Sequence, residues 1–141
     1  MILLSVPKRH THHGSVLVIA PALLQPAYRR YEAPQGAVRY AASIGEALPI
    51  LAHEHIAAIV YHEHEAQIEM GRSLAHWFAN VRGAAPLLAV VAGLDNAASL
   101  HLSVLQPYAS MVFSKYHHRP DEVIAMVVEN FVSTRKKKQK P

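Results

Sequence analysis

The chain has 141 residues, of which 51% are hydrophobic and 17% charged, and it contains no cysteine. This length and apolar content fit one compact domain. The lack of cysteine excludes a disulfide framework, a thiolate nucleophile and iron–sulfur or zinc-finger sites. The longest apolar runs are far shorter than the ~20 residues of a membrane span, and residues 1–7 have no signal-peptide pattern. We therefore expect a cytoplasmic protein without membrane contact.

The net charge of +4 is concentrated at the C-terminus. Subtracting the five cations of that end leaves residues 1–134 with a net charge of −1, so the body of the chain is nearly neutral. We expect a flexible N-terminal segment over residues 1–14, a folded domain over 15–132 and a basic tail or linker over 133–141. Nucleic acid would bind only weakly, through that tail. The five cations are Arg135, Lys136, Lys137, Lys138 and Lys140.

Short runs of β-branched and aliphatic residues predict five strands. Runs of about six such residues are too short for buried helices and are typical of parallel strands covered on both faces. The predicted strands span residues 15–20, 37–42, 56–61, 87–92 and 111–114.

Helix signals lie between these strands. The segment 21–31 predicts a helix that Pro26 weakens, and Ser43 with Glu46 forms a capping box that opens a helix to about residue 52. Apolar residues at helical spacing follow at positions 74, 77, 78 and 81, and Gly83 can end that helix. Asp95 can cap a helix to about residue 106.

Pro120 suits the first position of the last helix, which is predicted to end near residue 132. Strands and helices thus alternate along the whole chain. The sequence predicts an α/β fold of three layers, with a five-stranded parallel sheet and helices on both faces.

The spacing of the strand ends and the segment SKYHHRPDEVIAMV resemble a response-regulator receiver domain over residues 15–132. The resemblance implies a flavodoxin-like sheet of strand order 2-1-3-4-5. It also implies that the family's phosphorylation pocket falls on five residues. In the family these positions hold an acidic pair, the phosphoryl-accepting Asp, Thr or Ser, and Lys. Here they are Ala20, Pro21, Tyr61, Val91 and Lys115.

Only Lys115 matches the family pattern. Phosphoryl transfer to a carboxylate needs a nucleophilic Asp and a Mg²⁺ held by neighbouring carboxylates. The only aspartates are Asp95 and Asp121, which are explained as helix starts. We therefore expect a pseudo-receiver that is neither phosphorylated by the family mechanism nor an enzyme, and that uses no cofactor.

Two other groups near the third strand are considered as replacements for the missing carboxylates and the missing phosphoryl acceptor. Glu63 and Glu65 follow that strand and are interpreted as surface residues of a loop, although glutamate at the pocket could hold a cation. Tyr61 has no activating base in view and is interpreted as filling the core or the pocket.

Eleven histidines are unusual in a chain of this length, and they raise the question of a metal site. His62 and His64 would point the same way at strand spacing, which suits zinc, nickel or copper. We favour solvated loop histidines and keep these two as the metal candidates, with pH-responsive behaviour as a further alternative.

The resemblance also implies a contact surface on the fourth helix, fifth strand and last helix. We expect it to bind a protein partner or a second copy of the chain. As in a transcription or signalling regulator, an effector domain could then lie outside this chain. The alternative function is a small-ligand or transition-metal sensor that uses the vacated acidic pocket. The candidate contact residues are Leu105, Tyr108, Val112, Tyr116, Val127 and Phe131.

Overall fold

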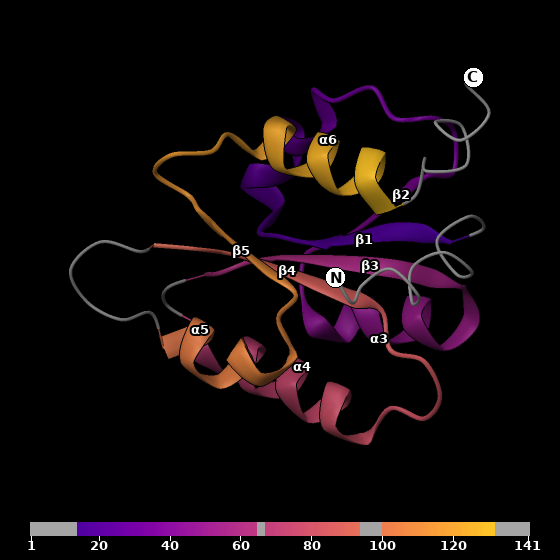
Figure 1. Cartoon of the computed structure of the whole chain (residues 1–141), viewed down its shortest axis with the longest axis vertical. Coiled ribbons are helices and arrows are strands. Elements are labelled where there is room, and N and C mark those ends of the chain that lie inside the picture. The colour runs from indigo at the N-terminus through magenta and orange to yellow at the C-terminus, as the bar shows by residue number, and fades with distance from the viewer. Residues whose placement is uncertain (1–13, 65–66, 94–99, 132–141) are drawn as a thin grey trace.

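The structure is a computed structural model that describes residues 14–64, 67–93 and 100–131 (Figure 1). Its strands are β1 (Ser15–Ile19), β2 (Val38–Ala41), β3 (Ile56–His62), β4 (Leu87–Ala92) and β5 (Met111–Ser114). Its α-helices are α2 (Gln25–Arg29), α3 (Ile44–His53), α4 (Ile68–Asn80), α5 (Leu100–Leu105) and α6 (Pro120–Phe131). Two 3₁₀ turns, η2 (Ala22–Leu24) and η3 (Gln106–Tyr108), precede α2 and follow α5.

The strands form one parallel sheet in the order β2-β1-β3-β4-β5. In the register, Ile19 of β1 lies beside Tyr61 of β3, which in turn lies beside Val90 of β4. The predicted three-layer α/β fold with flavodoxin-like strand order is therefore confirmed. Because all strands run the same way, their carboxyl ends meet at one edge of the sheet.

Helices cover both faces of this sheet (Figure 1). Within β1, Leu17 and Ile19 pack against α3, α4 and α5, whereas Val16 and Val18 pack against α2 and α6. Alternation along a strand thus supplies both cores, and burial on both sides explains why the strand sequences are continuously apolar. Buried apolar surface of this kind supplies most of the driving force for folding.

Most helix signals act as the sequence predicts. Ser43 caps α3, with its Oγ accepting the Glu46 N–H at 3.2 Å, and Glu46 reaches back to the N–H of Ala42 at 2.7 Å. Pro120 is the first residue of α6. The segment 21–31 differs from the prediction, because it forms η2 and then a short α2 with Pro26 near its start, where the missing N–H costs nothing.

Several predicted features fall on residues that the structure does not describe: Asp95, Glu65, the predicted helix end at Val132, most of the N-terminal segment and the basic tail. Within the described residues, no helix is both long enough and apolar enough to cross a bilayer.

Candidate functional site

The carboxyl edge of the sheet is where the sequence places the degenerate pocket, and the strand ends fix what lies there. β3 continues one residue beyond the predicted end, so its last residue is His62 and not Tyr61. Past the strands, the Glu63 N–H donates to the Val91 carbonyl at 3.0 Å and the Lys115 N–H to the Ala92 carbonyl at 3.0 Å. These two bonds hold Glu63 and Lys115 against the end of β4.

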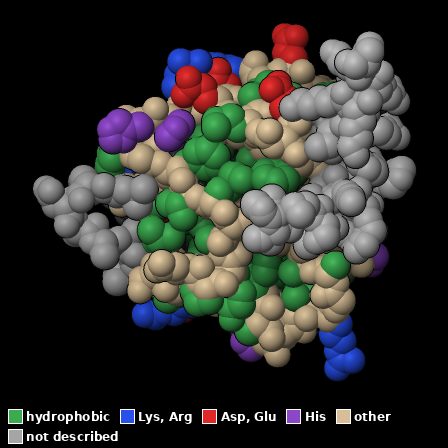
Figure 2. All heavy atoms as spheres, viewed as in Figure 1, with side chains coloured by type: hydrophobic (Ala, Val, Ile, Leu, Met, Phe, Trp, Pro, Cys, Tyr) green, Lys and Arg blue, Asp and Glu red, His purple; other side chains and the backbone are tan. Residues whose placement is uncertain are grey.

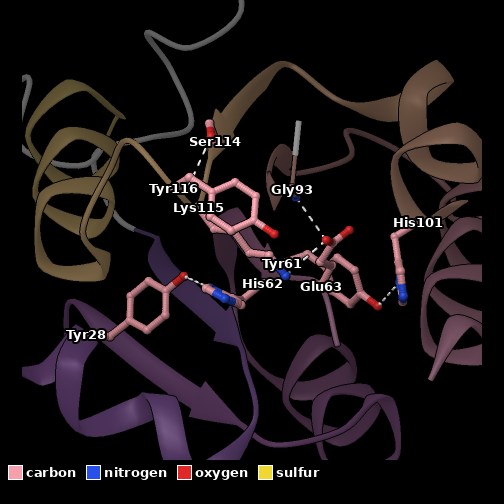
Figure 3. A network of polar contacts seen from close by, with 9 residues as sticks. All are labelled: Tyr28, Tyr61, His62, Glu63, Gly93, His101, Ser114, Lys115 and Tyr116. Atoms are coloured by element: carbon pink, nitrogen blue, oxygen red, sulfur yellow. Dashed lines mark hydrogen bonds and ion pairs between the residues drawn. The ribbon is translucent and has the colours of Figure 1, made fainter. Parts of the chain in front are cut away.

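Glu63 is the centre of the site. Its Oε2 accepts the Gly93 N–H at 2.9 Å and lies 3.2 Å from the Lys115 Nζ (Figure 3). The Glu63 side chain is 5% exposed and that of Lys115 is 17% exposed. The prediction that Glu63 lies on the surface is therefore wrong. A carboxylate can be buried here because a cation and a backbone donor compensate the loss of water.

Tyr116 lies over this ion pair. A Cβ added at Gly93 would lie 3.2 Å from both Cε2 and Oη of Tyr116, and 3.4 Å from Cε of Lys115. A Cβ at this position would therefore require the ring of Tyr116 or the stem of Lys115 to shift by a few tenths of an ångström. Tyr116 is nevertheless 59% exposed, so one face of its ring covers the site while the other meets solvent.

His62 points to the α2 side of the sheet. Its Nδ1 and the Tyr28 Oη share a hydrogen bond of 2.8 Å, and the two rings meet edge to face (Figure 3). Burial, aided by the nearby Lys115 ammonium, lowers the pKa of His62 to about 4, although Glu63 opposes the shift. Burial also raises the pKa of the Tyr28 hydroxyl. At neutral pH both partners are uncharged.

Tyr61 points to the opposite face. Its Oη shares a hydrogen bond of 2.9 Å with Nδ1 of His101 on α5, and burial raises the pKa of this hydroxyl. Burial lowers the pKa of His101, partly offset by Glu63 and the backbone of His64. The expectation that Tyr61 fills the core is confirmed, since the residue is fully buried against α3, α4 and α5.

The remaining predicted pocket residues do not line an open site. Ala20 and Val91 are fully or almost fully buried in the core on the α2 and α6 side. Pro21 is partly exposed and begins the turn after β1. Of the five positions, only Lys115 contributes a charged side chain to the edge, and Tyr61 contributes a hydroxyl that is bonded to His101.

The two metal candidates do not converge. His62 is buried and bonded to Tyr28, while His64 lies beyond the end of β3 and is partly exposed, so strand spacing no longer relates them. Among residues 14–64, 67–93 and 100–131, no three His, Asp or Glu side chains are grouped so that they could hold a metal ion.

Two of the candidate contact residues are wrong, because they are core residues. Leu105 is fully buried and Val127 is 1% exposed, since α5 and α6 turn these side chains toward the sheet. Tyr108 is partly buried and stacks on Phe78, and Phe131 packs against the core on the α6 side. Val112 and Tyr116 are exposed, at 40% and 59%.

Three residues of the site were missed by the sequence analysis: Tyr28, Gly93 and His101. Gly93 had a signal, because it directly follows an apolar strand and a glycine there suggests a close approach. No local sequence signal points to Tyr28 and His101, since their hydrogen-bond partners are 34 and 40 positions away in the sequence.

The arrangement can hold a fixed, buried ion pair flanked by two neutral tyrosine–histidine pairs. Among the residues that the structure describes it offers no carboxylate pair for Mg²⁺, and the Tyr61 hydroxyl is buried against α5. Searches against protein-family models, curated proteins and solved structures gave no match to this chain.

Proposed function

We propose that the chain is a receiver-like regulatory domain that works without phosphorylation, by contact with another protein chain. The flavodoxin-like strand order and a lysine directly after β5 support the likeness to receivers. The contact partner would be a regulator or effector, or a second copy of this chain, in the cytoplasm. Fold alone does not define function, so the argument depends on the site.

The observation that carries the proposal is the position of the Glu63 carboxylate. In a phosphorylatable receiver the lysine has to be available to the phosphorylated side chain. Here the Lys115 Nζ and the Gly93 N–H both face Oε2 of Glu63, at 3.2 and 2.9 Å. A permanent side-chain anion thus occupies the place that a transient anion would need. We infer a single fixed state rather than a switch, and no enzymatic activity.

The alternative, a small-ligand or metal sensor at the strand ends, has weaker support. His62, Glu63 and Lys115 are mostly buried and fill the space where a ligand would enter. A hollow of about 460 Å³ lies elsewhere, between α3 and α4, with Leu48 and Trp77 in its lining. We therefore favour protein contact through exposed residues such as Tyr116 and Val112.

The test combines a chemical and a physical readout. The protein is incubated with acetyl phosphate and Mg²⁺, and separately with beryllofluoride and Mg²⁺. We expect no phosphoryl adduct by intact mass and no change in melting temperature or in mass by light scattering. A receiver with an intact aspartate, treated alongside, shows that the reagents are active. An adduct on this chain, or a change in its association state, would refute the proposal.

A further inference from the structure

The hollow of about 460 Å³ lies between α3 and α4, which pack on the same face of the sheet (Figure 1). Its volume is in the range of small-molecule sites, which are mostly apolar and carry a few polar groups. The hollow shares no lining residue with the site at the strand ends, so a molecule bound there would not contact the Glu63–Lys115 ion pair.

The apolar wall of the hollow is held in place by packing. On α3, Ile44 belongs to the core, whereas Leu48, one turn later, is 42% exposed. On α4, Trp77 packs against the same core, and its ring meets Phe78 edge to face with 5.0 Å between the centroids. Phe78 in turn stacks on Tyr108 at 5.5 Å. The indole of Trp77 therefore forms a fixed aromatic surface that a planar ring can contact.

A row of polar side chains runs along α4 beside this wall. Arg72, His76 and Asn80 recur every four positions, so they follow one side of the helix over about 12 Å. All three are exposed, as is Ser73, which also lines the hollow. Among the described residues that line it there is no Asp or Glu. The hollow therefore offers an anion one guanidinium and further hydrogen-bond donors.

The surroundings of the hollow are compatible with an anion. In Figure 2, acidic side chains gather at the top of the view, over α6, whereas basic and histidine side chains project at the bottom, where α4 lies in Figure 1. Glu69 accepts a hydrogen bond from Nη1 of Arg72 at 3.0 Å, but both side chains are mostly exposed, at 76% and 58%, so this pair is weak. A guanidinium has five N–H donors and can bind a second carboxylate.

We propose that the hollow between α3 and α4 binds a small aromatic carboxylate. Its ring lies against Trp77 and Leu48, and its carboxylate accepts hydrogen bonds from the Arg72 guanidinium at the rim. An inorganic anion would leave the apolar wall uncovered, and a neutral aromatic molecule would leave the charge of Arg72 unused. This inference goes beyond the proposed function, because it assigns the domain a ligand at a second place.

The fluorescence of Trp77 tests the proposal directly, because it is the only tryptophan of the chain. Its emission is followed while three probes are added separately: 3-phenylpropionate, the neutral 3-phenylpropanamide, and acetate. We expect a saturable change with 3-phenylpropionate. The amide keeps the ring and loses the charge, so it should bind about tenfold more weakly. Acetate lacks the ring and should give no saturable change.

NMR locates the bound probe on the parent chain, without any substitution. The indole N–H of Trp77 and the methyl groups of Leu48 should shift when 3-phenylpropionate is added. The methyl group of Met126, which is exposed on α6, should not shift.

Two matched pairs of variants test the contacts. Arg72→Gln should weaken the binding of 3-phenylpropionate by about tenfold and leave that of the amide unchanged. Arg82→Gln changes an exposed arginine just beyond α4 and should alter neither. Leu48→Glu places a carboxylate in the hollow and should abolish binding, whereas Met126→Glu, at a similar exposure of 43%, should have no effect. Circular dichroism verifies that all four variants are folded.

Four results would overturn this inference. The first three are equal responses to the acid and the amide, equal losses in Arg72→Gln and Arg82→Gln, and no saturable response to 3-phenylpropionate in the millimolar range. The fourth is a change in Trp77 emission when the protein is diluted without a probe, which would mean that a second copy of the chain covers the hollow.

Discussion

Acid should destabilise this domain through His62. Its pKa is about 4 in the folded protein, against an ordinary value of 6.5, because burial disfavours the charged imidazolium. Between these two values the unfolded chain binds more protons than the folded one, so the free energy of unfolding falls as the pH falls. The stability that the neutral His62 contributes is fully present above pH 6.5 and is lost progressively toward pH 4.

The magnitude follows from the two pKa values. Their separation corresponds to about 3 kcal/mol, of which about 2 to 3 kcal/mol is lost by pH 4.5. A domain of this size is stable by about 5 to 15 kcal/mol, so a loss of this size shifts the urea midpoint clearly. Trp77 fluorescence and circular dichroism report the unfolding at pH 7, 6, 5 and 4.5.

His62→Gln isolates the effect. The variant keeps a polar side chain opposite Tyr28 but does not titrate, so its free energy of unfolding should fall less steeply than that of the parent. Other groups, including His101, titrate in both proteins and cancel in the difference. Two results would refute the reasoning. One is parallel pH profiles for the two proteins, and the other is a His62 imidazole that titrates near pH 6.5 by NMR.

The other predictions concern the ion pair and one close helix contact. Glu63→Gln and Lys115→Met should each lower the free energy of unfolding by about 3 kcal/mol, because each leaves a buried group without its partner. The double variant should lose less than the sum, and urea titrations that give strict additivity would contradict the pairing. Gly71→Ala should destabilise by about 1 kcal/mol, since its Cβ would lie 3.0 Å from Nδ1 of His101. Gly45→Ala, whose Cβ would have 3.7 Å to its nearest neighbour, should be neutral or stabilise by up to about 1 kcal/mol, and equal effects by thermal melts would contradict the close contact.

The fold could be predicted from the sequence because its signals are local. β4 and β5 have the predicted bounds, since each is a short apolar run between turn residues. α6 begins at Pro120, where a missing N–H is tolerated. The first helix was harder to predict. Pro26 is also tolerated only near a helix start, so α2 begins later than predicted and η2 precedes it.

The site could be predicted only in part, because its contacts are made in space. A glutamate after a strand is ordinarily exposed. Nothing near Glu63 in the sequence shows that Lys115 and Gly93 will enclose it. The burial of Val127 could have been predicted from helical spacing, because it belongs to one apolar stripe of α6. That stripe faces the sheet and consists of Val123, Ile124, Val127 and Val128.

Three consecutive residues at the end of β3 each engage a different part of the fold. Tyr61 bonds to α5, His62 to α2, and Glu63 to the ends of β4 and β5. β3 is otherwise a run of buried aliphatic side chains, and a slip by one position would exchange the face of the sheet on which each of them packs. Such a slip would turn each polar group toward the wrong partner and leave it buried without a hydrogen bond. The polar contacts of these three residues therefore help to fix the register of the central strand.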